Sequence, residues 1–199
     1  MKKGIFCLEG LWSSSVRDRS TVQPMLEIMN KRSICDHIHH SCATKEELIY
    51  FLNRFKSKSV QDKFPILYFG FHGEKDCICL AGKEKFTLTE LGDVLANSAK
   101  GKVLYFASCD TLNTDERKIK NLLEKTGAIA AIGYKALIDW MQSAAFDLLV
   151  LDALQSDRFD GRGIQKIKDY ITSEYGNLGN KLKFRMVIND RIHFPRKRK

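Results

Sequence analysis

Short apolar runs alternate along the chain with segments in which apolar residues recur every three or four positions. The short runs are typical of β-strands, and the recurring positions are typical of amphipathic helices. The apolar runs predict strands at residues 3–11, 33–41, 64–71, 76–81, 102–108, 128–133 and 184–189. The periodic segments predict helices at residues 22–31, 44–56, 89–97, 113–125, 139–154 and 164–175. Because strands separated by helices of this length form βαβ crossovers, we expect an α/β fold with a mainly parallel sheet and helices on both faces.

Local signals mark several of the predicted helix ends. Thr44 with Glu47, and Asn113 with Glu116, each have the three-residue spacing of a capping box. Gly127 is placed to end the second of these helices.

Composition favours one soluble domain. The chain has 199 residues, of which 44% are hydrophobic and 29% charged, and it contains no internal repeat or Pro/Gly/Ser-rich linker. We therefore expect a single domain over residues 1–194, followed by a basic and loosely ordered tail at 195–199. The net charge is +9, but the last four residues carry four of the positive charges. The tail is thus the main argument for nucleic acid, which we do not expect as a partner.

The start of the chain and the cysteines indicate the compartment. Residues 1–9 do not resemble a secretion signal, because their apolar stretch is short and Glu9 interrupts it. No apolar run approaches the roughly 20 residues that cross a bilayer, so no membrane contact is expected. We expect a cytoplasmic protein. In that reducing compartment the six cysteines are predicted to be buried thiols with one reactive site, rather than a disulfide framework.

Two chemically active side chains follow the two strongest predicted strands. His72 and Gly73 come directly after the strand 64–71, and Cys109 comes directly after the strand 102–108. Chemistry in parallel sheets gathers at the carboxyl ends of the strands, and neighbouring strands lie about 4.8 Å apart. A cysteine nucleophile needs a base, and histidine titrates near neutrality. His72 or Cys109 alone would be interpreted as a structural residue. Together, at the ends of consecutive strands, they favour a catalytic dyad.

The order of motifs from residue 64 to about 154 resembles a known superfamily. An apolar strand leads into His72-Gly73, a strand ends in Cys109-Asp-Thr, and an amphipathic helix leads into Gly127-Ala and another strand. A long helix then opens at Asp139. This order resembles the caspase-like cysteine peptidases, in particular their bacterial CHAT-type and separase-like branch. The resemblance implies a three-layer caspase-like sandwich.

The resemblance also implies roles for individual residues. His72 would be the general base, Cys109 the nucleophile, and the backbone N–H groups of Gly73 and Cys109 the oxyanion hole. The fitting function is a cysteine endopeptidase that forms an acyl-enzyme on a protein or peptide substrate, with no metal and no cofactor. Asp139 would bind a basic residue before the cleaved bond, although an Asp here is also a good helix N-cap. In the family, bacterial members often act in defence or regulated cell death.

The chain departs from the caspases proper in two ways. It lacks their Gln-Ala-Cys-x-Gly signature, and 37 residues separate His72 from Cys109 instead of about 50. Cleavage after aspartate is therefore not expected. With one domain only, the chain is also consistent with a separate regulatory protein that activates it.

Several other interpretations stay open. The histidines and cysteines of 35–42 suggest a metal, but residues on one face of a strand are about 6.7 Å apart, which is too extended for a single ion. A strand near the sheet edge is favoured there. A catalytically silent caspase-like interaction module remains an alternative function. A nucleotide-binding or nucleic-acid-binding α/β domain is a third, although no Gly-x-Gly-x-x-Gly or P-loop follows any strand.

Overall fold

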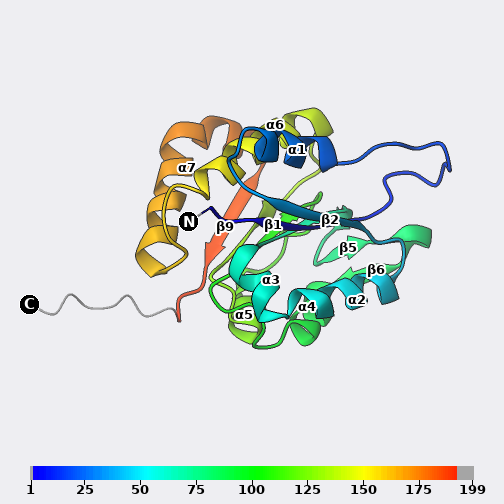
Figure 1. Cartoon of the computed structure of the whole chain (residues 1–199), viewed down its shortest axis with the longest axis horizontal. Helices are drawn as coiled ribbons and strands as arrows, with labels where there is room; N and C mark the ends of the chain where they lie inside the picture. The colour runs from blue at the N-terminus through cyan, green and yellow to red at the C-terminus, as the bar shows by residue number, and fades with distance from the viewer. Residues whose placement is uncertain (1, 192–199) are drawn as a thin grey trace, which may run out of the picture.

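A six-stranded sheet forms the centre of the computed structural model, which describes residues 2–191 (Figure 1). The strand order is β2–β1–β3–β7–β8–β9, and only β9 is antiparallel to its neighbour. The strands are β1 (Ile5–Glu9), β2 (His37–Ser41), β3 (Ile66–Gly70), β7 (Val103–Ala107), β8 (Ala130–Tyr134) and β9 (Phe184–Ile188). The expected α/β fold with a mainly parallel sheet is confirmed.

Helices cover both faces of this sheet (Figure 1). One layer contains α1 (Gln23–Lys31), α6 (Trp140–Ala153) and α7 (Gly161–Lys181). The other contains α2 (Lys45–Phe55), α4 (Leu88–Val94) and α5 (Glu116–Thr126), and α3 (Lys58–Lys63) leads into β3. Successive residues of a strand face opposite layers. In β1, Cys7 therefore packs in the first core and Leu8 in the second.

The helix ends follow the local signals with one exception. Thr44 and Glu47 form the predicted capping box at α2, and Gly127 ends α5 in the left-handed conformation at φ 77°. The prediction that Asn113 caps α5 is wrong. Asp115 is the cap and accepts from the N–H of Arg117. The side chain of Asn113 donates instead to Asp110 in the turn before the helix.

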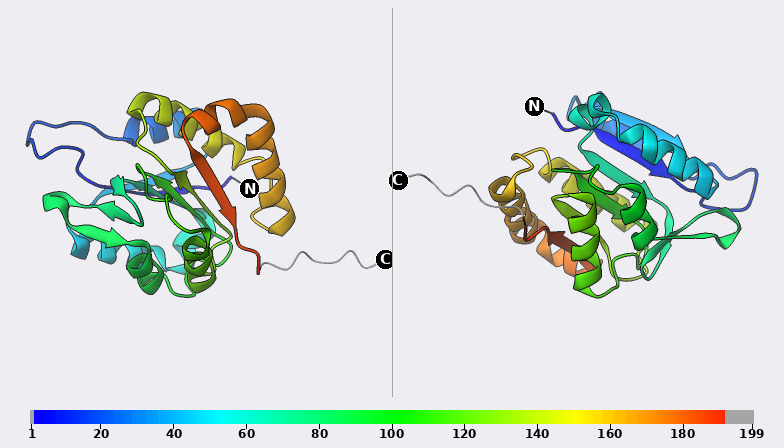
Figure 2. Two further views of the ribbon diagram at one scale, coloured as in Figure 1. Left: turned by 180° about the vertical axis from the view of Figure 1, so that it is seen from behind. Right: turned by 90° about the horizontal axis from the view of Figure 1, so that it is seen from below.

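A second, small sheet lies beside the carboxyl end of β3. It consists of β4 (His72–Glu74), β5 (Cys77–Cys79) and β6 (Lys85–Thr87), with a 3-10 turn at Ala81–Lys83. Only the middle strand lies within a predicted strand, residues 76–81, because the residues of β4 and β6 form no comparable apolar run. This small sheet and the loop between β1 and α1 project from the same side of the molecule (Figure 2).

Helix α7 is longer than the segment predicted at 164–175. It begins where Asp160 caps the N–H groups of Arg162 and Gly163, and it continues past Gly176 and Gly179. Glycine disfavours a helix, but Gly179 packs against the ring of Phe146 and tertiary contact outweighs the intrinsic preference. No helix among residues 2–191 has the length and apolar character needed to cross a membrane. The tail predicted at 195–199 lies outside the described residues.

Candidate active site

The sheet register brings the two predicted catalytic residues to the same level. Strands β3 and β7 are parallel neighbours, and Gly70 pairs with Ala107. His72 and Cys109 each follow this pair by two residues, so both leave the sheet at its carboxyl edge. β1 lies on the other side of β3, with Glu9 paired to Gly70. The loop after β1 therefore emerges at the same edge.

The ring of His72 is held by Trp12 in that loop. The N–H at Nε2 of His72 donates to the backbone carbonyl of Trp12 at 2.8 Å. The indole also meets the imidazole edge to face, with 5.3 Å between ring centroids. A carbonyl can only accept, so the proton of the neutral imidazole sits on Nε2 and the lone pair on Nδ1. Nδ1 is thus the atom that can act as a base.

Hydrogen bonds fix the turn that carries Cys109. Ser108 and Thr111 share a buried hydroxyl contact of 2.7 Å, and Thr111 also donates to the carbonyl of Cys77 at 3.0 Å. Asp110 has φ 54°, a left-handed conformation that Asp tolerates better than most residues. The N–H of Asp110 donates to the carbonyl of Ala136. The half-buried Cys109 therefore sits on a turn tied to strand β5 and to the loop after β8.

Gly73 makes a close backbone approach to this turn. A Cβ at Gly73 would lie 2.2 Å from the Cys109 carbonyl oxygen and 2.4 Å from Oγ1 of Thr111. Only glycine allows the His72 strand and the Cys109 turn to pack at this distance. The residue after the histidine thus sets the relative position of the two predicted catalytic groups.

His72 and Cys109 line one cavity of about 160 Å³. Most of its wall is apolar or aromatic, and it comes from strands, loops and the first turns of helix α6. The other lining residues are Trp12, Val22, Tyr68, Phe71, Ala107, Ser108, Ile138, Trp140, Ser143, Ala144 and Asp147. A cavity with a thiol and an imidazole on its wall can hold a side chain of a bound peptide next to the nucleophile.

Three comparisons with known proteins place this chain. A family described only as being of unknown function (DUF6642) matches residues 2–188. The chain belongs to this family. No curated protein matches it in sequence. Among solved structures it is similar to a secreted C11 cysteine protease from Bacteroides thetaiotaomicron, in complex with an irreversible peptide inhibitor. The TM-score is 0.56 at 12% identity, over 89% of this chain and 59% of the other, so the likeness shows a caspase-like fold.

The cavity also contains a buried acid, Asp147, which the sequence analysis missed. Three phenols donate to its carboxylate: Tyr68 at 2.8 Å, Tyr105 at 2.6 Å, and Tyr134. Burial raises the pKa of Asp147 to about 6, against the lowering effect of these three hydrogen bonds. The sequence signal was an acid on the apolar face of helix α6, in line with Val150 and Leu151.

Asp139 occupies a different position. It is exposed and caps α6 by accepting from the N–H of Gln142 at 2.8 Å. The next residue, Trp140, lines the cavity, whereas Asp139 is not among the lining residues. The capping role that the sequence suggested is thus present, and a role in binding substrate stays a prediction.

The remaining cysteines are in environments that suppress reactivity. All six cysteines are free thiols. Burial raises the pKa of Cys35 to about 11, that of Cys42 to about 12 and that of Cys79 to about 11. It also raises the pKa of Cys7 and Cys77. A thiol with a raised pKa carries little thiolate near neutral pH and attacks slowly.

The histidines of 35–42 face opposite sides of the edge strand β2. His39 pairs with Glu9 at 2.5 Å, whereas His40 stacks on Phe51 with ring centroids 4.1 Å apart. Within residues 2–191, no group of three or more His, Cys, Asp or Glu side chains is arranged to hold a metal ion.

Proposed function

We propose that this protein is a caspase-like cysteine endopeptidase with His72 as general base and Cys109 as nucleophile. The observation that carries the proposal is their position on one cavity, at the carboxyl ends of neighbouring parallel strands. The close packing of Gly73 on the Cys109 turn adds support, since it fixes the distance between the two segments. The caspase-like fold of the C11 protease is consistent with this chemistry.

The geometry supports a two-step mechanism. Nδ1 of His72 takes the proton of the Cys109 thiol, and the thiolate attacks the carbonyl carbon of the scissile peptide bond. The backbone N–H groups of Gly73 and Cys109 donate to the resulting oxyanion. The imidazolium, stabilised by the Trp12 carbonyl, then protonates the leaving amine. Water, activated by His72, hydrolyses the acyl-enzyme and restores the thiol.

Substrate preference and regulation follow from the CHAT-type resemblance. Asp139 sits at the start of helix α6 and is exposed, so its charge is available to a lysine or arginine that precedes the cleaved bond. The resemblance also suggests that a separate regulatory protein activates the enzyme. The role of Asp139 is tested separately from the dyad.

The test is covalent labelling with acyloxymethyl ketones that carry lysine, arginine or neutral side chains. We expect mass spectrometry to locate the label on Cys109 of the wild-type protein and to find none on Cys109→Ala. His72→Ala should label at least about 100-fold more slowly, because general base catalysis contributes that much or more. His37→Ala, a histidine on the edge strand, is the matched control and should label like the wild type.

The opposite result distinguishes the alternative. If folded wild-type protein is not labelled by any of these side chains, the endopeptidase proposal fails. A catalytically silent caspase-like interaction module would then fit the structure better.

A further inference from the structure

Glu9 is a buried acid outside the dyad, at the end of strand β1. The loop of residues 10–22 follows it and leads to helix α1, and residues 13–20 of this loop are exposed. Only 2% of the Glu9 side chain is accessible to solvent. An acid buried to this degree is expensive unless its oxygens are fully hydrogen-bonded.

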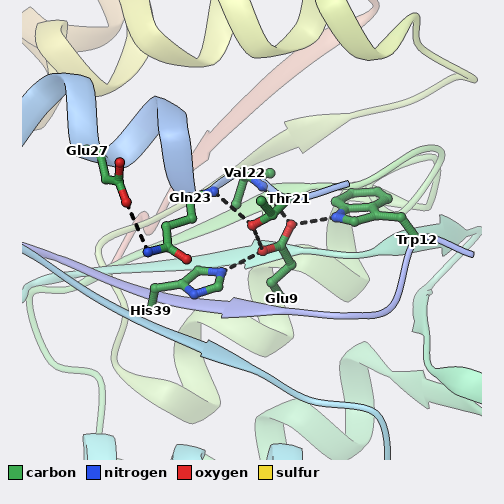
Figure 3. A network of polar contacts seen from close by, with 7 residues as sticks. All are labelled: Glu9, Trp12, Thr21, Val22, Gln23, Glu27 and His39. Carbon is green, nitrogen blue, oxygen red and sulfur yellow. Dashed lines mark hydrogen bonds and ion pairs between the residues drawn. The ribbon is translucent and has the colours of Figure 1, made fainter. Parts of the chain in front are cut away.

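Four donors satisfy the carboxylate of Glu9 (Figure 3). Oε1 accepts from the indole N–H of Trp12 at 2.5 Å and from the backbone N–H of Val22 at 2.7 Å. Oε2 accepts from the hydroxyl of Thr21 at 2.6 Å and from Nε2 of His39 at 2.5 Å. Trp12 lies near the start of the loop, and Thr21 and Val22 lie at its end. One carboxylate therefore joins both ends of the loop to each other and to strand β2.

The hydrogen bonds also keep Glu9 ionised. Burial alone would raise the pKa of Glu9, but the bonds from His39, Thr21, Trp12 and Val22 outweigh burial and lower it. The group is thus a carboxylate at neutral pH, and it accepts from every donor around it.

Trp12 links this network to His72. Its indole N–H is bound to Glu9, its backbone carbonyl accepts from Nε2 of His72, and its ring packs against the imidazole. The position of the Trp12 carbonyl depends on the path of the loop, and Glu9 fixes that path at both ends. Trp12 also lines the cavity, whereas Glu9 does not touch it.

We propose that Glu9 is a positioning residue for His72, acting through Trp12. By closing the loop it keeps the Trp12 carbonyl on Nε2 of His72, which holds the proton there and leaves Nδ1 to receive the thiol proton. This inference rests on the proposed function for its catalytic consequence, but its structural part can be measured without any turnover.

The experiment compares Glu9→Gln with Glu27→Gln in the full chain. A glutamine at position 9 keeps the size but places an N–H₂ group against donors, so at least one of the four bonds is lost. Glu27 lies at the edge of the same network, where it accepts from Gln23 and does not contact Trp12 (Figure 3). It is therefore a matched control for the loss of one negative charge.

Two readouts separate the inference from the proposed function. The ¹⁵N shifts of the His72 ring, assigned with His72→Ala, should show the Nε2–H tautomer in the wild type and in Glu27→Gln, and a mixture in Glu9→Gln. For labelling at Cys109, the maximal inactivation rate should fall about tenfold in Glu9→Gln with little change in inhibitor affinity. If the wild type is not labelled, the proposed function fails while the tautomer measurement still tests Glu9.

Trp12→Phe keeps the inference testable if Glu9→Gln does not fold. It removes the indole N–H and retains the backbone carbonyl, so it should shift the His72 tautomer in the same direction. In a folded double variant the two effects should be less than additive, because both act through one hydrogen bond. An unchanged His72 tautomer in Glu9→Gln or in Trp12→Phe would overturn the inference.

Discussion

At the scale of single residues, the site depends on the close packing of Gly73 against the turn that carries Cys109. The Cα of Gly73 faces the Cys109 carbonyl and the Thr111 hydroxyl at distances that exclude a methyl group. These two atoms belong to a turn that is already tied to Cys77 and Ala136. A side chain at position 73 would therefore have to move backbone rather than a flexible neighbour.

Gly73→Ala should lower the free energy of unfolding by about 1–3 kcal/mol, the usual cost of overpacking. It should also abolish labelling of Cys109, because the turn must shift away from His72. Gly176→Ala in helix α7 is the control: no atom lies within 4 Å of a Cβ there, and alanine favours the helix, so stability should rise by up to about 1 kcal/mol. Urea denaturation measures both changes, and equal stabilities would contradict the packing argument.

Asp147 predicts a pH dependence of stability. Burial raises its pKa in the folded protein from 3.8 to about 6, so the native state holds this proton more tightly than the unfolded chain. The stability that this group contributes is complete below about pH 4 and is lost as pH rises toward 6. Relative to Asp147→Asn, the wild type should lose on the order of 3 kcal/mol across this window.

Urea denaturation between pH 4 and 7 measures this difference. Tyr105→Phe removes a donor that lowers the pKa of Asp147 in the folded protein, so the upper end of the window should extend to higher pH in that variant while its lower end stays in place. Parallel stability curves for the wild type and Asp147→Asn would show that the buried acid does not titrate there.

At the scale of elements, the start of helix α6 combines two roles that one substitution can separate. Asp139 caps the helix through its bond to the N–H of Gln142, and an asparagine oxygen can do the same. Binding of a basic substrate residue requires the charge, which asparagine lacks.

Asp139→Asn should therefore keep the wild-type free energy of unfolding, whereas Asp139→Ala should lose about 1 kcal/mol. Both variants should lose the preference for lysine and arginine in labelling of Cys109. If Asp139→Asn retains that preference, Asp139 is a helix cap only.

The sequence predicted elements better than it predicted contacts between them. The buried strands β3 and β7 are continuous apolar runs, so their ends, and with them His72 and Cys109, could be found directly. The strands β4 and β6 could not, since neither forms an apolar run and both depend on pairing with β5.

At the scale of the whole molecule, the partners of the site come from distant parts of the chain. Trp12 and His72 are 60 residues apart, and Tyr68 and Asp147 are 79 residues apart. Such contacts arise only when the strands have taken their order in the sheet, and no local pattern encodes them. The sequence analysis noted Glu9 as an acid that interrupts an apolar run and missed Asp147, and it could not name the partners of either acid.

The whole fold also predicts which thiol reacts. Burial raises the pKa of Cys7, Cys35, Cys42, Cys77 and Cys79, and a thiol of pKa about 11 is roughly one part in a thousand thiolate at pH 8. Iodoacetamide should modify Cys109 first in the folded protein, because it shares a cavity with His72, and all six cysteines in denaturant. Mass spectrometry should show the fast phase lost in Cys109→Ala and retained in Cys79→Ala. A fast phase at Cys79, the other half-buried thiol, would contradict this order.

Because Glu9 joins the two ends of the loop at residues 10–22, the tip of the loop can change in sequence and length without disturbing the fold. Val16 is fully exposed, and the span that the tip must bridge is set at Glu9 rather than by the number of residues beyond it. Doubling the length of such a loop costs only about 0.6 kcal/mol of chain entropy. Insertions of an epitope or a binding peptide between Val16 and Arg17 should therefore be accepted with little change in the free energy of unfolding. The tip of this loop is thus a place where a new binding function can be added without changing the sheet or the cavity.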